Sequence, residues 1–295
     1  MSPISAKQFV RDAKTALQHL YGEDEAGAMA LRLLLDSCAM PRHRYVADGD
    51  KPLGEEALRL LKSRLAELEK GAPLQYVLGF TEFCGHRFKV GPGVLIPRPE
   101  TEELAASVIS AFEERELSDD EEFTILDMCT GSGCLAWSLA AALPGAVVYG
   151  CDISDEALRY ACRQKIKCDS SRPVFFKADI LQPPPAGLPK FSLIVANPPY
   201  VMESERERMR PNVLDFEPSE ALFVPDSDPL LHYRAIARWA ASLLGEGGEI
   251  WLEINEALGA PTAAIFTPEE GWDRPGTRAE IRKDIFGKER FVRIW

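Results

Sequence analysis

The sequence predicts an α/β fold with a mainly parallel sheet covered by helices on both faces, preceded by a small helical domain. Helical periodicity runs through residues 5–70, whereas short apolar stretches alternate with helix-length segments from about residue 100 onward. The second pattern is typical of a mainly parallel sheet with helices on its two faces. The length of 295 residues also exceeds one typical domain, so one small and one large domain fit best.

The first segment, residues 1–79, is predicted to form a bundle of helices. Pro41, Pro52 and the stretch Gly71-Ala72-Pro73 interrupt the helical pattern. The apolar residues that recur at helical spacing are Leu31, Leu34, Leu35 and Cys38, and then Leu58, Leu61, Leu65 and Leu68. A bundle of this size buries only a modest core. Because it carries no catalytic motif, we expect it to recognise a substrate.

Residues 80–97 change to a β-like pattern. The stretches FTEFCGHRFKV and VLIP are separated by Gly91-Pro92-Gly93, which is a turn sequence. The sequence therefore predicts a β-hairpin linker between the helical domain and the remainder of the chain.

Residues 98–295 are predicted to form the catalytic domain. Helices are expected at 132–143, 155–167 and 229–244, and strands at 123–128, 146–151, 174–177, 191–196, 249–254 and 291–295. Ligands of such sheets bind at the carboxyl ends of the strands, near the point where the strand order reverses. Functional residues are therefore expected in the loops that follow the strands.

Composition narrows the classes of function. The net charge is −12, and residues 1–80 hold 11 basic and 11 acidic side chains, so the remainder holds 23 basic against 35 acidic. An acidic catalytic domain argues against a dedicated binder of duplex DNA. The seven cysteines are scattered and only four histidines accompany them, so no metal site is expected. No apolar run has the length of a signal peptide core or a membrane span, which predicts a cytoplasmic protein without a membrane partner.

The first chemical motif follows the strand predicted at 123–128. That strand ends at Asp127, passes through Cys129 into Thr130-Gly131-Ser132-Gly133, and leads into a helix near Cys134. Glycines allow a sharp turn and a close approach of the backbone to a ligand. The next strand ends in Asp152, whose carboxylate is placed to accept hydrogen bonds from ribose hydroxyls. These features indicate a nucleotide-like ligand.

Two ligands fit this loop. Gly131-x-Gly133-x-x-Ala136 with Asp152 about 20 residues later satisfies the loose fingerprint of NAD-binding folds. Asp127 would repel a pyrophosphate, whereas it would attract the cationic amino-acid end of S-adenosylmethionine. We therefore expect Asp127 to contribute to S-adenosylmethionine binding. The alternative for Asp127 is a cap of the following helix or loop.

The second motif is Asn197-Pro198-Pro199-Tyr200, which follows an apolar strand. Two adjacent prolines cannot continue a central strand, because each lacks a backbone donor and has a fixed φ. The Asn197 side chain and the Pro198 carbonyl can therefore point at one spot, where two acceptors suit an NH₂ group. Tyr200 can stack on a planar substrate. A simple strand-terminating turn is the alternative.

The chemistry of amides explains why such a site is needed. An amide nitrogen delocalises its lone pair into the carbonyl and is a poor nucleophile. Two acceptors orient this nitrogen and stabilise the positive charge that it gains during methyl transfer. The same geometry would serve the exocyclic amine of a flipped adenine in DNA or of a guanine in RNA. A second alternative, an NAD-dependent oxidoreductase, would give the tetrapeptide no function. A third, an inactive binding module, would require that Cys129 abolish cofactor binding.

At these residues the chain resembles the HemK-type N(5)-glutamine methyltransferases of class-1 peptide chain release factors. The segments that carry the resemblance are GAPLQYVLGFTEFCGHRFKV, LIPRPETEEL, LDMCTGSG, CDIS, ANPPYV, FEPSEALF and KDIFGKERFVRIW. The resemblance implies the class I S-adenosylmethionine-dependent methyltransferase fold, with S-adenosylhomocysteine as product. It also implies that the substrate is the glutamine of the GGQ loop in a release factor, while the acidic charge and the N-terminal helical domain disfavour nucleic acid as the partner.

Residue roles follow from the resemblance. It implies that Asp152 holds the ribose of S-adenosylmethionine and that Asp179 and Ile180 lie on the adenine side. The methionine part would be held by Cys129, Thr130, Gly131, Ser132 and Gly133. The substrate glutamine would be held by Asn197, Pro198, Pro199 and Tyr200, of which Asn197, Pro198 and Tyr200 are expected to act in catalysis. Arg98 and residues 100–102 would border the mouth of the site or form a buried ion pair.

Two positions depart from the family pattern. Cys129 stands where glycine is usual, and a Cβ at a positive φ would cost on the order of 1 kcal/mol. Asn255 follows Leu252-Glu253-Ile254, where glycine is common. Asparagine tolerates left-handed backbone better than most residues, so this second change is expected to be mild.

Overall fold

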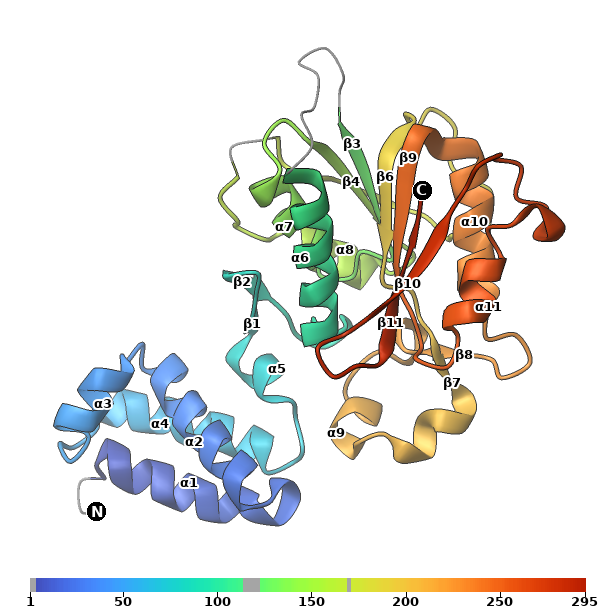
Figure 1. Ribbon diagram of the computed structural model, residues 1–295. Coiled ribbons are helices and arrows are strands. Elements are labelled where there is room, and N and C mark those ends of the chain that lie inside the picture. The colour runs from blue at the N-terminus through green and yellow to red at the C-terminus, as the bar shows by residue number, and fades with distance from the viewer. Residues whose placement is uncertain (1–3, 114–122, 169–170) are drawn as a thin grey trace. The chain divides into compact units, whose positions relative to one another are not determined.

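The computed structural model describes residues 4–113, 123–168 and 171–295, and it divides into two compact units (Figure 1). The first unit contains Met1–Phe80 together with Arg210–Phe216. The second contains Thr81–Met209 and Glu217–Trp295. A short segment from the second half of the chain therefore belongs with the N-terminal helices.

The N-terminal unit is helical, as predicted. Ser5 caps the first helix, because its hydroxyl accepts a hydrogen bond from the backbone N–H of Gln8. Gly22, with φ of 74°, separates the first two helices. The helices are α1 (Ala6–Tyr21), α2 (Glu23–Ser37), α3 (Arg42–Asp48), α4 (Glu55–Leu68) and α5 (Leu74–Leu78), with the short α9 (Pro211–Leu214) from the inserted segment.

The buried face of α2 differs from the predicted stripe. Leu34 is buried, but Leu31 and Leu35 are only partly buried. The face that packs inward carries Ala26, Ala30, Leu33 and Leu34. Alanines have little volume and therefore allow α1 and α2 to approach each other closely. In α4 the predicted stripe is correct, since Leu61 and Leu68 are buried and Leu58 and Leu65 pack against the same core.

A two-stranded hairpin follows, but its turn lies elsewhere than predicted. The strands are β1 (Phe80–Phe83) and β2 (His86–Lys89), and the turn between them is Cys84-Gly85. Both turn residues have positive φ, 47° and 73°, as two-residue hairpin turns often require. The stretch VLIP at 94–97 forms no strand, so Gly91-Pro92-Gly93 does not join two strands of a hairpin, although a turn does form there, in which the N–H of Val94 donates to the carbonyl of Gly91 at 3.3 Å.

The second unit is built on a seven-stranded sheet and confirms the predicted α/β fold. The strand order is β10-β11-β9-β6-β3-β4-β5. The pairs among β9, β6, β3, β4 and β5 are parallel, whereas β11 is antiparallel to both neighbours. The strands are β3 (Thr124–Met128), β4 (Val147–Asp152), β5 (Val174–Lys177), β6 (Phe191–Ala196), β9 (Leu244–Glu253), β10 (Ala279–Lys283) and β11 (Glu289–Ile294). The strand order reverses between β3 and β6, which is where ligands of such sheets bind.

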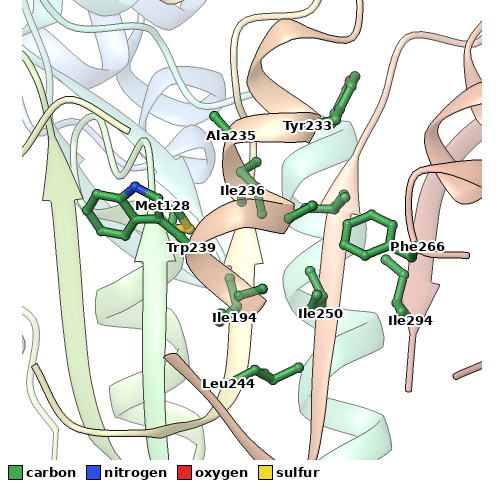
Figure 2. Packing of buried hydrophobic residues seen from close by; sticks show 14 of the residues in the cluster. Met128, Ile194, Tyr233, Ala235, Ile236, Trp239, Leu244, Ile250, Phe266 and Ile294 are labelled. Atoms are coloured by element: carbon green, nitrogen blue, oxygen red, sulfur yellow. The ribbon is translucent and has the colours of Figure 1, made fainter. Parts of the chain in front are cut away.

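Helices cover both faces of this sheet (Figure 1). One face carries α6 (Pro99–Glu113), α7 (Cys134–Ala142) and α8 (Asp155–Cys162), and the other carries α10 (Leu231–Leu243) and α11 (Gly259–Ala264). Each face has its own apolar core. Figure 2 shows the core under α10, in which Trp239 and Ile236 pack in one cluster with Ile250.

The remaining elements are short. They are β7 (Val201–Met202), β8 (Phe223–Val224) and three 3₁₀ turns at Glu203–Arg208, Ser219–Ala221 and Pro268–Glu270. Strands β7 and β8 pair in parallel directly after the Asn197–Tyr200 segment. Among the described residues, no helix combines the length and the apolar character that a membrane crossing needs.

Candidate active site

A cavity of about 250 Å³ lies at the carboxyl ends of β3, β4, β5 and β6. The loops after all four strands contribute to its wall. Nine predicted site residues line it: Cys129, Thr130, Gly131, Ser132, Asp152, Asp179, Ile180, Asn197 and Pro199. Four others, Asp127, Gly133, Pro198 and Tyr200, are not among its lining residues. The two sequence motifs therefore meet at one cavity.

The loop between β3 and α7 curves tightly because three of its residues have positive φ. These are Cys129, Gly131 and Gly133, with φ of 60°, 55° and 79°. A Cβ at Gly133 would lie 3.0 Å from the Cβ of Ala161, so packing as well as backbone geometry requires glycine there. The N–H of Thr130 donates to the carbonyl of Cys151 at 2.9 Å and ties the loop to β4.

Asp127 lies beneath this loop and is fully buried. Its Oδ2 accepts hydrogen bonds from the Thr130 hydroxyl at 2.5 Å and from the Ala136 N–H at 3.1 Å. Ala136 is the third residue of α7, so the carboxylate caps that helix as well as the loop. Burial raises the pKa of Asp127 to about 7. The attraction of Asp127 for a cationic ligand stays a prediction.

Asp152 and Asp179 follow β4 and β5. Asp152 accepts one hydrogen bond on each oxygen, from the N–H of Gly131 at 2.8 Å and from that of Ser154 at 2.9 Å. It thereby joins the glycine loop to the end of β4, and burial raises its pKa. Oδ1 of Asp179 accepts from the N–H of Leu181 at 2.9 Å. Both carboxylates are held by backbone donors at the cavity wall.

Hydrogen bonds hold the tetrapeptide after β6 at its first and third residues. Asn197 Nδ2 donates to the hydroxyl oxygen of Thr101 at 2.9 Å. Nδ1 of His232 lies 2.9 Å from the carbonyl oxygen of Pro199, so this ring nitrogen carries the proton and donates. Burial lowers the pKa of His232, which favours the neutral ring. Asn197, Pro199, Thr101 and His232 all border the cavity.

Glu253 lies at the end of β9 and is fully buried next to the tetrapeptide. The Thr101 hydroxyl donates to its Oε2 at 2.7 Å, and the Tyr200 hydroxyl donates to its Oε1 at 2.8 Å. Burial raises the pKa of Glu253 to about 7. Glu253 and His232 were not predicted as site residues, whereas Thr101 lies within residues 100–102, which were expected at the mouth of the site. A carboxylate at the end of an apolar strand was the available signal for Glu253.

Arg98 has both of the roles that were left open for it. It lines the cavity, and its guanidinium pairs with Glu217 at 2.8 Å. The Glu217 side chain is only 1% exposed and also accepts from the N–H of Ile96 at 3.0 Å. Glu102 instead accepts from the N–H of Cys84 at 2.7 Å and is not a lining residue.

The polar groups of the cavity discriminate between the two candidate ligands. Asp152, Asp179 and Glu220 line it, whereas its guanidinium, Arg98, is already paired. Such a wall repels a pyrophosphate and suits hydroxyl groups and a cation. Two buried polar atoms of the loop region, Asp127 Oδ1 and Ser132 Oγ, have no hydrogen-bond partner among the described residues. Ser132 lines the cavity and Asp127 lies beneath its loop, so an ammonium group bound there would meet a hydroxyl oxygen and a nearby negative charge.

Two family models match parts of the chain. The family described as PrmC N-terminal domain matches residues 8–79, and the family described as Methyltransferase small domain matches residues 108–213. A human methyltransferase 10 domain-containing protein of known structure is 15% identical, with a TM-score of 0.46, covering 81% of this chain and 96% of that chain.

Two curated relatives are similar over nearly their whole length. The release factor glutamine methyltransferase of Bacteroides thetaiotaomicron is 37% identical over 279 residues, which covers 95% of this chain and 96% of the relative. The protein of the same name from Flavobacterium psychrophilum is 37% identical over 287 residues, covering 97% and 96%. The chain therefore belongs to the release factor glutamine methyltransferase family.

Proposed function

We propose that this protein transfers a methyl group from S-adenosylmethionine to the side-chain amide nitrogen of the glutamine in the GGQ loop of a class-1 release factor. One observation carries the proposal: Asn197 lines the cavity, and its Nδ2 donates a hydrogen bond to the hydroxyl oxygen of Thr101. Nδ2 keeps a second N–H, but the amide oxygen is the acceptor of this side chain, and an acceptor is what a substrate NH₂ group requires. The names of the two relatives support a release factor as the substrate.

Residues 129–133, together with Asp152, Asp179 and Ile180, are proposed to hold S-adenosylmethionine. When bound, it supplies an electrophilic methyl group on a positively charged sulfur, and S-adenosylhomocysteine remains as product. The acidic cavity wall and the two partnerless atoms Asp127 Oδ1 and Ser132 Oγ support this assignment. Because Asp152 accepts from Gly131, the same carboxylate also keeps the glycine loop in its curved form.

The substrate nitrogen is proposed to be held by Asn197 Oδ1 and by the carbonyl of Pro198. Two acceptors orient the NH₂ group and stabilise the positive charge that develops on its nitrogen. The hydroxyl of Tyr200 is anchored on Glu253, which leaves its ring to pack along the planar amide. The nitrogen gains one methyl group and loses one proton, which we propose passes to water.

The partner is proposed to be the release factor protein and not nucleic acid, since the second unit carries the whole acidic excess. Release factors act on ribosomes, so we propose the cytoplasm as the working compartment.

A competition between substrate classes tests the proposal. The protein is incubated with labelled S-adenosylmethionine and an equal mixture of purified class-1 release factor, duplex DNA and ribosomal RNA. We expect label in the release factor. Label in DNA or RNA with none in the release factor would instead assign the site to an exocyclic amine.

A further inference from the structure

We propose that Glu253 is a positioning residue that acts through Thr101 to fix which atom of the Asn197 amide faces the substrate. This inference rests on the proposed function, because it explains how Asn197 becomes an acceptor and not a donor. Glu253 touches neither the cavity nor a ligand directly, since it is not a lining residue. Its effect reaches the cavity through the hydroxyl of Thr101, which lines the cavity, while its other carboxylate oxygen accepts from Tyr200.

Three separate elements bring this network together. Thr101 lies in the first turn of α6, Asn197 follows β6 and Glu253 ends β9. Thr101 is 3% exposed and Glu253 is fully buried. A buried carboxylate without donors is strongly disfavoured, so each oxygen of Glu253 needs a partner. Thr101 and Tyr200 provide one donor for each oxygen.

When Glu253 is ionised, the donors and acceptors of the network allow only one orientation of the Asn197 amide. An ionised Glu253 can only accept, and Thr101 has a single hydroxyl proton, which it gives to Oε2. The Thr101 oxygen can then only accept from Asn197, and the amide donor of asparagine is Nδ2. Because Nδ2 is directed at Thr101, Oδ1 is the amide atom left for the cavity. A reversed amide would present a donor to the substrate NH₂ group, which is itself a donor.

A glutamine at position 253 would disrupt this arrangement without changing the shape of the site. Its side chain has one acceptor oxygen and one NH₂ donor in place of two acceptors. It can therefore satisfy either Thr101 or Tyr200, but not both, unless one hydroxyl reverses its direction. Reversal of the Thr101 hydroxyl would turn it toward Asn197 and favour the wrong orientation of the amide.

The orientation can be observed without substrate or cofactor. The sequence contains three asparagines, Asn197, Asn212 and Asn255, so selective ¹⁵N-asparagine labelling gives three side-chain NH₂ signals. The Asn197 signal, identified by its loss in Asn197→Asp, is expected to exchange slowly with solvent. In Thr101→Val, which keeps the shape and removes the hydroxyl, this signal should shift and exchange faster. The Asn212 signal should not move, since that residue belongs to the other unit and reports correct folding.

Steady-state kinetics provide the second measurement. For Thr101→Val and Glu253→Gln we expect kcat to fall roughly 10- to 100-fold, less than the loss typical for removing a preorganised contact itself. The affinity for S-adenosylmethionine and the KM for release factor should stay within a few-fold, because the cofactor wall is untouched. Thr101→Ser keeps the hydroxyl and should restore most of both the rate and the slow exchange.

Three outcomes decide the matter. Unchanged Asn197 signals and unchanged kcat in Thr101→Val would overturn the inference, and so would a Thr101→Ser variant as impaired as Thr101→Val. If Thr101→Val does not fold, the Asn197 side-chain NH₂ signal and kcat are measured in Glu253→Gln instead, and no change in either would overturn the inference. A wild-type protein that methylates no release factor would defeat the proposed function, whereas the labelled spectra would still test the positioning of Asn197.

Discussion

At the scale of single residues, the account depends on the Asn197 amide as the acceptor that prepares the substrate nitrogen. Asn197→Ala should lower kcat by about 100- to 1000-fold, the usual cost of losing one preorganised contact to a developing charge. The affinity for S-adenosylmethionine, measured by calorimetry, should stay within a few-fold, because Asp152 and the glycine loop remain in place. A variant with normal turnover would remove Asn197 from the mechanism.

Glu253 predicts a measurable dependence of stability on pH. Its pKa is about 7 in the folded protein against an ordinary value of 4.5, mainly because of burial. Between these two pH values the folded state binds more protons at this site than the unfolded state does, so this residue makes the free energy of unfolding fall as pH rises through the window. Glutamine does not titrate, so Glu253→Gln loses this pH dependence. The free energy of unfolding of the variant relative to wild type should therefore rise between about pH 4.5 and pH 7.

Urea unfolding at several pH values measures this difference in the free energy of unfolding. Asp127 also has a raised pKa, but its effect on stability is the same in both proteins and cancels in the difference. Glu246→Gln, at an exposed position of the same strand, is the matched control and should follow the wild type. A stability difference for Glu253→Gln that stays constant from pH 4.5 to pH 7 would contradict the assigned burial effect.

The residues of the site divide into those that sequence reveals and those that it hides. The glycine loop and the Asn197–Tyr200 segment each carry their signal in consecutive residues. The supporting bonds do not, because Thr101 is 96 residues from Asn197 and 152 residues from Glu253. The concern about Cys129 was justified, since its φ is 60°. Asn255 differs: it is not among the described residues with positive φ, and its Nδ2 instead donates to Glu205 at 2.8 Å.

At the scale of elements, the loop between β3 and α7 carries a conformational cost at Cys129. Glycine adopts positive φ without that cost, so Cys129→Gly should be more stable than Cys129→Ala by about 1 kcal/mol. Comparison with alanine removes the packing of the thiol from both variants and leaves only the Cβ. Urea unfolding gives the two free energies. An alanine variant as stable as the glycine variant would show that the loop carries no such strain.

The elements that sequence predicted well are those with a buried, regular pattern. The strands at 191–196 and 174–177 have the predicted bounds, and the central strand at 124–128 is buried along its whole length. The edge strand β10 was missed because its five residues are exposed or only partly buried, so no apolar pattern marks it. The hairpin turn at Cys84-Gly85 was missed because the glycines and proline at 91–93 gave a stronger turn signal.

At the scale of the whole molecule, the sequence predicts domains as consecutive segments, and the structure departs from that. Residues 210–216 belong to the first unit, where Phe216 packs against the helical core and lies 3.7 Å from a Cβ placed at Gly71. No local pattern marks this return, because it depends on contacts between residues far apart in the chain. The recognition role of the N-terminal helices stays a prediction.

Removal of residues 1–75 tests that role. The truncated protein should keep most of its affinity for S-adenosylmethionine, because all of the cavity residues lie in the second unit. Its kcat/KM for intact release factor should fall much more than its kcat/KM for a short GGQ peptide, since only the whole protein can use remote binding energy. The truncation removes the helical core against which Phe216 packs, which leaves this apolar side chain exposed. Circular dichroism and cofactor titration must therefore show that the variant is folded before its kinetics are compared. Equal loss on both substrates in a folded truncation would refute the recognition role.

The position of the transferred methyl group tests the central claim most directly. A class-1 release factor is treated with the protein and S-adenosylmethionine, digested, and fragmented in a mass spectrometer to locate the modification. The proposed function predicts one added methyl group on the side-chain nitrogen of the GGQ glutamine, and none when that glutamine is replaced by alanine. A methyl group on another residue, or equal methylation of the alanine-substituted release factor, would contradict it.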